Sequence, residues 1–282
     1  MSNQSARIGR VSKFGPLVSA DWLSEHLAAE DLRVIDLRWY LDGRSGRDAY
    51  LAGHIPGAVF VDLERDITGV DGPGRHPLPN REQFQEAMRA AGVEPESGVV
   101  VYDDQGGYSA ARLWWLMRYF GHPLVAVLDG GLLAWRGDLE REPASPPRGS
   151  FWAAVPDQTM VVDRDQVRAA RRAVLFDARA PDRYRGEAEP IDAKAGHIPG
   201  ARNVPWRSNL DADWHFLPGD QLQRNYAGAK GREVIAYCGS GVSAGVDLLG
   251  LELAGITGAK LYEGSWSDWS RQDLPVATGE EP

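Results

Sequence analysis

The sequence predicts an α/β fold made of two tandem domains, each a parallel sheet with helices on both faces. Two observations lead to this prediction. An internal repeat spans the chain, and short β-branched runs alternate with segments of helical spacing. The 282 residues suffice for roughly two domains of about 150 residues, each with its own core.

The repeat consists of four segments that recur in the same order. The first half contains VIDLR (34–38), GHIPGA (53–58), VVVYDDQGGYSAAR (99–112) and LDGGLLAW (128–135). The second half contains LFDAR (175–179), GHIPGA (196–201), VIAYCGSGVSAG (234–245) and LYEGSWSDW (261–269). Tyr102 matches Tyr237 at an offset of 135 residues, and Trp135 matches Trp269 at 134. A period this long indicates duplicated domains rather than a solenoid.

The segment between the copies, EREPASPPRGSFWAAVP (140–156), is rich in proline. Prolines at this density continue neither a helix nor a central strand, so we predict a semi-extended linker. We expect a first domain over residues 1–141, a linker over 142–156 and a second domain over 157–282.

The second copy shows the expected alternation most clearly. VLFDAR, EVIAYC and AKLYEG predict buried parallel strands, and DRDQVRAARR, GDQLQRNYAG and SAGVDLLGLELAG predict helices, the last ending in a glycine that suits a C-cap. Parallel sheets of this kind carry their sites at the carboxyl ends of strands. Cys238, the only cysteine in the chain, directly follows such a strand.

Composition excludes several classes of protein. The net charge of −9 argues against a nucleic-acid partner. No run approaches the about 18 apolar residues of a membrane helix, and the N-terminal stretch MSNQSARIGRVSKFGP lacks the apolar part of a signal peptide. One cysteine forms no internal disulfide, and no metal-ligand spacing is present. We therefore expect a cytoplasmic protein without membrane, nucleic-acid or metal binding.

The loop after Cys238 favours a reactive sulfur. Its small residues let the backbone curl, so that successive N–H groups form an anion nest, and a helix that begins near Ser243 adds its positive end. Both effects favour a thiolate, and both would hold a persulfide anion. The alternative, a buried and inert cysteine, does not explain the strand-end position together with the glycine-rich loop.

Three other motifs match this loop only in part. GSGVSA satisfies G-x-G-x-x-A, but the 38 residues after Ala244 are too few for a nucleotide-binding half. GVSAG satisfies G-x-S-x-G, but the hydrolase fold needs a later histidine and the last one is His215. A cysteine phosphatase needs an arginine six residues after its cysteine, where this chain has Ala244.

The first copy serves as an internal control, because Asp103 stands where the second copy has Cys238. A carboxylate does not accept a sulfur atom as a thiolate does, so we expect an inactive first domain that supplies a wall of the site. We interpret Asp103 and Asp104 as a solvated or loop-capping pair. Four polar residues recur in both copies and are expected to serve the fold: His54, His197, Asp36 and Asp177.

The chain resembles the tandem-domain sulfurtransferases of the rhodanese superfamily, from about Leu17 to about Pro275. The resemblance rests on GHIPGA in both halves, on DGGLLAW, and on a strand–cysteine–glycine loop in the second half alone. It implies two rhodanese-like domains and sulfur transfer through a Cys238 persulfide, with no metal or organic cofactor.

The loop CGSGVSA is similar to that of the mercaptopyruvate-using members, whereas thiosulfate-preferring members typically carry an Arg-Lys pair after the cysteine. A neutral Gly-Ser pair suits a monoanionic 2-oxo acid thiol better than a dianion. The resemblance further implies a proton relay of Ser240, His76 and Asp62. Its implied substrate site has Arg183 for the donor anion, with five loop residues and Tyr108 around it: Gly239, Gly241, Val242, Ser243 and Ala244.

One departure concerns the second arginine that mercaptopyruvate-using members often have. Ile191 and Asp192 stand where we would look for it, and Arg185 or Lys194 are the candidates to replace it. Trp39 is expected either to line the cleft with Tyr108 or to pack in the core.

The expected reaction moves sulfur from 3-mercaptopyruvate through Cys238 to a thiol, a thioredoxin-like protein or, in an assay, cyanide. Thiosulfate as the donor is the nearest alternative. A non-catalytic persulfide carrier or sensor is an alternative of a different class, which would have no use for the implied proton relay.

Overall fold

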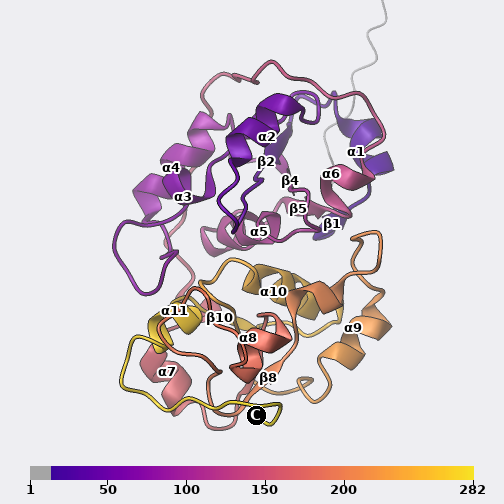
Figure 1. The fold of residues 1–282 in the computed structure, drawn as a ribbon. Helices are drawn as coiled ribbons and strands as arrows, with labels where there is room; N and C mark the ends of the chain where they lie inside the picture. The colour runs from indigo at the N-terminus through magenta and orange to yellow at the C-terminus, as the bar shows by residue number, and fades with distance from the viewer. Residues whose placement is uncertain (1–13) are drawn as a thin grey trace, which may run out of the picture.

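The computed structural model describes residues 14–282 and forms two lobes (Figure 1). Each lobe contains a five-stranded sheet, ordered β1-β5-β4-β2-β3 in the first and β6-β10-β9-β7-β8 in the second, and every strand pairing is parallel. The same strand order in both lobes, with flanking helices, confirms the predicted duplicated α/β fold. Residues 1–13 lie outside the described residues. They include most of the N-terminal stretch for which the sequence predicts no signal peptide.

The first lobe consists of β1 (Leu17–Val18), α1 (Ala20–His26), β2 (Leu32–Asp36), α2 (Gly46–Ala52), β3 (Val59–Phe60), α3 (Leu63–Asp66), α4 (Arg81–Ala90), β4 (Gly98–Tyr102), α5 (Ala110–Tyr119), β5 (Val125–Leu128) and α6 (Gly131–Ala134). The second consists of the 3₁₀ turn η1 (Gln158–Met160), β6 (Val161–Val162), α7 (Arg164–Ala169), β7 (Val174–Asp177), α8 (Pro181–Arg185), β8 (Ala201–Asn203), η2 (Trp206–Asn209), α9 (Gly219–Asn225), β9 (Val234–Tyr237), α10 (Ala244–Leu253), β10 (Lys260–Tyr262) and α11 (Ser265–Trp269).

The strands predicted in the second copy form as β7, β9 and β10, and the predicted helices form as α7, α9 and α10. The central strands β7 and β9 are buried along their whole length, as expected for strands covered by helices on both faces. None of the described helices is long and apolar enough to cross a membrane.

The proline-rich segment is extended, with neither helix nor strand between α6 and η1. It packs along the first lobe, where Phe151 is buried against Phe84 at 5.9 Å between ring centroids and Arg148 pairs with Glu86. The predicted linker, residues 142–156, falls inside this segment.

Helices α5 and α10 join the lobes (Figure 1). A Cβ atom on Gly245 would lie 2.9 Å from the carbonyl carbon of Ala111, so the two backbones approach as closely as glycine permits. Their apolar residues belong to one continuous buried cluster that also contains Cys238. The loop after β9 is therefore enclosed between the two lobes.

Candidate active site

Cys238 lies at the carboxyl end of β9 and is 1% exposed. Its Sγ atom accepts a hydrogen bond from the Gly241 N–H at 3.1 Å. Gly241 has φ +82°, and a side chain there would clash with the Glu263 carbonyl at 2.9 Å. Glycine at this position therefore allows the backbone to turn its N–H toward the sulfur.

The turn after β10 fixes the loop from its other side. The N–H groups of Trp266 and Ser267 donate to the carbonyls of Cys238 and Gly239, each at 2.9 Å. Ser265 adopts φ +52° and its Oγ accepts from the Cys238 N–H at 3.2 Å. The loop next to the sulfur is thus held in place before any substrate binds.

The matching loop of the first lobe holds an anion of its own. The Asp103 carboxylate accepts backbone N–H bonds from Gln105, Gly107, Ser109 and Ala110 at 2.8–2.9 Å. Burial raises the pKa of Asp103, and these four hydrogen bonds oppose that rise. The interpretation as a loop-capping residue is confirmed, while a solvated Asp103 is wrong because its side chain is fully buried.

Ser240 and His76 come together from different lobes, with Oγ and Nδ1 2.7 Å apart. Burial lowers the pKa of His76 to about 4, and the positive charges of Arg112 and Arg75 add to this effect. The imidazole is therefore neutral at pH 7.

Asp62 does not join this pair. Its carboxylate caps α3 by accepting the N–H groups of Glu64 and Arg65, each at 3.0 Å. Aspartate is a favoured N-cap residue because its short side chain can accept the first free N–H groups of a helix. The Asp62 carboxylate is used in this way, and it does not make the expected contact with His76. The carboxylate nearest to His76 is that of Glu64, 3.8 Å from Nε2, which also accepts from Trp39 Nε1.

Arg112 is a site residue that the sequence analysis missed. It comes from α5, is 1% exposed, and donates to the carbonyls of Gly241 at 3.0 Å and His76 at 3.1 Å. Burial lowers the pKa of Arg112 to about 10, against the nearby negative charges of Cys238 and Glu263. A signal was present in the repeat, because the second copy has Asp247 at the matching position.

A cavity of about 130 Å³ lies over the sulfur. It is lined by Leu41, Arg75, Tyr108, Arg179, Ala180, Arg183, Trp206, Cys238, Gly239, Ser240 and Ser243. The predicted substrate-site residues Tyr108, Arg183, Gly239 and Ser243 are among them. Val242 and Ala244 do not line the cavity, and their side chains are buried in the apolar cluster that also contains Cys238.

Aromatic rings form one wall of this cavity. Tyr108 stacks on Trp39 with centroids 6.2 Å apart and meets Trp206 edge-on at 4.9 Å. Burial and the Cys238 charge raise the pKa of Tyr108 to about 12. Trp39 itself lies behind the wall, edge-on to His76 at 5.2 Å, so packing rather than lining the cavity is its role.

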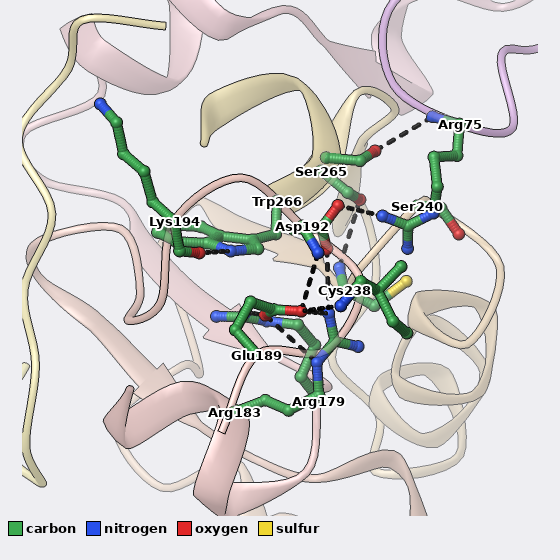
Figure 2. Close-up of polar contacts among 12 residues, drawn as sticks. Arg75, Arg179, Arg183, Glu189, Asp192, Lys194, Cys238, Ser240, Ser265 and Trp266 are labelled. Carbon is green, nitrogen blue, oxygen red and sulfur yellow. Dashed lines mark hydrogen bonds and ion pairs between the residues drawn. The ribbon is translucent and has the colours of Figure 1, made fainter. Parts of the chain in front are cut away.

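Charged groups also surround this cavity, and Figure 2 shows their contacts beside Cys238. Arg183 donates to Glu189 at 2.7 Å and to Asp192 at 2.9 Å. Asp192 also forms an ion pair with Arg75, which belongs to the first lobe. Burial raises the pKa of Asp192, while the arginines around it act in the opposite direction.

Neither predicted replacement for the second arginine reaches the cavity. Arg185 pairs with Glu187 at 2.8 Å, and Lys194 donates to the Gln272 carbonyl at 2.6 Å. Figure 2 shows the Lys194 side chain directed away from Cys238.

The residues that recur in both copies serve the fold, as predicted. His54 Nδ1 lies 2.9 Å from the Tyr50 carbonyl, and His197 Nδ1 lies 2.8 Å from that of Tyr184. Asp36 and Asp177 each form a buried ion pair with the arginine two residues later in the sequence, Arg38 and Arg179 respectively. Within residues 14–282, no three His, Cys, Asp or Glu side chains gather as metal ligands.

Comparisons with known proteins agree with this geometry. A family model described as the rhodanese-like domain matches residues 19–138 and 163–272. A probable 3-mercaptopyruvate sulfurtransferase of Pseudomonas aeruginosa is 43% identical over 282 residues, covering 94% of this chain and 98% of that protein. A putative thiosulfate sulfurtransferase of Mycobacterium tuberculosis is 42% identical over 277 residues, covering 93% and 97%.

Solved structures give the same result. The crystal structure of a 3-mercaptopyruvate sulfotransferase from Escherichia coli superposes with a TM-score of 0.80 at 37% identity, covering 90% of this chain and all of the other. The Tum1 protein of Saccharomyces cerevisiae superposes with a TM-score of 0.84 at 27% identity, covering 94% and 98%.

Proposed function

The chain belongs to the rhodanese family as a tandem-domain sulfurtransferase, and from this premise we propose that it takes sulfur from 3-mercaptopyruvate onto Cys238. The observation that carries the proposal is the loop around the sulfur. Cys238 Sγ accepts the Gly241 N–H, and the next two side chains are the neutral Gly239 and Ser240, the latter in contact with a neutral His76. Such a loop binds a monoanionic thiol donor and offers it a path for a proton.

In the first half-reaction, the Cys238 thiolate attacks the thiol sulfur of the donor. The bond between that sulfur and C3 breaks, and its electron pair leaves as the enolate of pyruvate. The donor's thiol proton passes through Ser240 Oγ and His76 to C3 of the enolate. Pyruvate and a Cys238 persulfide anion result, with atoms and charge balanced.

The persulfide keeps its negative charge close to the Gly241 N–H and the start of α10. In the second half-reaction, a thiolate attacks the outer sulfur and Cys238 leaves as a thiolate. We propose a small thiol or a thioredoxin-like protein as acceptor, in the cytoplasm, where a single cysteine stays reduced.

We assign Ser240 and His76 to the proton path without Asp62. The Asp62 carboxylate is occupied at the start of α3, and Glu64 is the acidic group near His76. We also infer that the first domain is catalytically inactive, because Asp103 fills its loop with a carboxylate.

Thiosulfate is a second candidate donor. Three arginines, Arg75, Arg179 and Arg183, line the cavity, and adjacent cations suit a dianion. Both donors would load the same sulfur on Cys238, so they differ in the first half-reaction alone.

Steady-state transfer to cyanide with each donor tests the proposal. We expect parallel initial-rate lines, a higher kcat/KM with 3-mercaptopyruvate, and no turnover in Cys238→Ser. Ser240→Ala is expected to lower kcat with 3-mercaptopyruvate about 100-fold or more, as for a lost proton-transfer group. With thiosulfate, which needs no proton, the same variant should change kcat little.

A higher kcat/KM with thiosulfate would contradict the assignment of the donor. Turnover that survives in Cys238→Ser would contradict the persulfide, and no turnover of either donor by the wild type would favour a carrier over an enzyme.

A further inference from the structure

We infer that a second groove, on the second domain, binds an extended segment of a partner protein that contains proline and acidic residues. The groove has a volume of about 500 Å³ and lies between α7, the start of β7, the second GHIPGA motif and α11. This volume is in the range of about 300–1,000 Å³ that is usual for ligand sites. No residue of the groove lines the cavity over Cys238, so the inference does not depend on the proposed function.

The internal repeat places a smaller groove at the same position in the first domain. Val34 and Pro56 line that groove, which has a volume of about 220 Å³. The residues that match them in the repeat, Leu175 and Pro199, line the larger groove of the second domain. The two grooves are therefore copies of one feature of the fold, and the first shows what can lie against it.

In the first domain, an extended proline-containing segment of the chain itself forms one wall of the groove. Pro146, from the linker, is among the lining residues, and a Cβ atom on Gly92 would lie 2.9 Å from its ring. The Ala144 N–H of the same segment donates to the Tyr50 hydroxyl at 2.9 Å. This face of the fold thus accepts a segment that has neither helix nor strand.

In the second domain, no corresponding segment of the described chain lies along the groove. Ala277 pairs with His197 just as the start of the linker pairs with the first GHIPGA motif. The chain then turns away, because the Gly279 N–H donates to the Arg185 carbonyl at 2.9 Å. Within residues 14–282, nothing after Pro275 lines this groove. The surface that the linker contacts in the first domain is therefore open in the second.

The open groove differs from its counterpart in charge. Arg33 lines the first groove, but its Nε donates to the Gly92 carbonyl at 2.7 Å. The second groove is lined by Arg168, whose side chain is 56% exposed, and by Arg171, which is also exposed. Within the described chain, the Arg171 side chain forms no hydrogen bond or ion pair. These two cations at the edge of an apolar floor favour a ligand with acidic side chains.

The apolar floor suits a segment in the polyproline II conformation. Trp269 and Pro275 lie side by side in the groove, and the Trp269 Nε1–H donates to the Pro275 carbonyl at 2.9 Å. Grooves lined by aromatic residues bind proline-rich segments, which are extended before binding and lose little entropy when they dock. Proline and glutamate in one extended segment would match both the floor and the edge of this groove.

Fluorescence anisotropy with a labelled peptide of alternating proline and glutamate tests the inference on the full-length protein. Two further peptides serve as comparisons, one with lysine in place of glutamate and one with glycine in place of proline. We expect saturable binding of the first peptide that weakens with added salt, weaker binding of the glycine peptide and no binding of the lysine peptide.

Charge-reversal variants locate the binding site. Arg168→Glu and Arg171→Glu should each raise the Kd of the proline–glutamate peptide at least about fivefold. Arg224→Glu is the matched control, because Arg224 is an exposed helix residue of the same domain that pairs with Asp220, as Arg168 pairs with Asp165, and it does not line the groove. Its Kd should stay within about twofold of the wild-type value.

Several outcomes would overturn the inference. No saturable binding to the wild type, or the same Kd in Arg171→Glu and Arg224→Glu, would remove the groove as the site. Equal binding of the proline and glycine peptides would show attraction between charges without recognition of an extended segment. A wild-type dimer in sedimentation that becomes a monomer in Arg171→Glu would assign the groove to a second copy of this chain.

Discussion

Cys238 and Asp103 occupy the same place in two copies of one loop, and the side chain of each accepts backbone N–H groups. In the first copy the carboxylate satisfies four of these donors itself. In the second copy a single sulfur takes one, at Gly241. The loop of the first copy is therefore filled by its own carboxylate, whereas the loop of the second copy can bind an additional anion. This difference depends on one residue.

The neutral state of His76 predicts a pH dependence of stability. An unfolded histidine titrates near pH 6.5, whereas burial lowers the pKa of His76 to about 4. Between these values the unfolded chain binds a proton that the folded chain does not, so stability falls as the pH decreases from 6.5 to 4. From pH 7 to pH 5, the wild type should lose about 2 kcal/mol more free energy of unfolding than His76→Gln. Urea unfolding of both proteins at the two pH values measures this, and equal losses would contradict a buried neutral His76.

At the scale of single residues, sequence reasoning depended on how local each signal was. Cys238 was found from its position after a strand and before small residues. Ser240 and His76, 164 positions apart, were paired only through the family resemblance. The sequence did not predict Arg75 as a site residue. Its partner Asp192 is 117 positions away, and the spacing of residues along a sequence does not indicate contacts at such a distance.

At the scale of elements, the loop after β4 is expected to depend on the carboxylate of Asp103. Asp103→Ala leaves four N–H groups without an acceptor, three of them buried, and we expect the free energy of unfolding to fall by about 3 kcal/mol. Asp104→Asn is the control, because Asp104 accepts one hydrogen bond, from Tyr40 at 2.6 Å, and should cost about 1 kcal/mol. Denaturant unfolding of both variants measures these losses of stability. Equal losses would contradict the claim that the Asp103 carboxylate stabilises the loop after β4.

The elements that the sequence predicts have a clear hydrophobic pattern, either a continuous apolar run or a helical repeat. β7, β9 and β10 are continuous apolar runs, and α10 spans ten residues. Helices α8 and α11 have five residues each, little more than one turn, which is too short for a helical period to be seen. They form because tertiary contacts hold them, such as the bond from Trp266 Nε1 to the Lys194 carbonyl.

At the scale of the whole molecule, the site is complete only when both domains are present. The second domain supplies Cys238, Ser240 and Arg183, and the first domain supplies His76 and Arg112. The duplicated fold was predictable from the repeat, and so was a contribution of the first domain to the site. Which side chains it contributes depends on the packing of α5 on α10, which the sequence does not specify.

Arg112 provides the test at this scale. Arg112→Met removes a buried positive charge next to Cys238 and leaves the Gly241 and His76 carbonyls without a donor. We expect alkylation of Cys238 by a small electrophile at pH 7 to slow about tenfold, because the sulfur loses a neighbouring positive charge that stabilises its reactive anionic form. Arg118→Met is the control, since Arg118 lies on the same helix and pairs with Glu252 across the domains, away from the sulfur. Equal rates in both variants would contradict an electrostatic role of Arg112.

The central claim is that Cys238 takes up a single sulfur atom from 3-mercaptopyruvate. Because the chain has one cysteine, the intact mass of the protein after incubation with the donor alone measures this directly. We predict a gain equal to the mass of one sulfur atom, located on Cys238, lost on addition of cyanide and absent in Cys238→Ser. An unchanged mass while pyruvate is released, or a gain located elsewhere in the chain, would contradict the account.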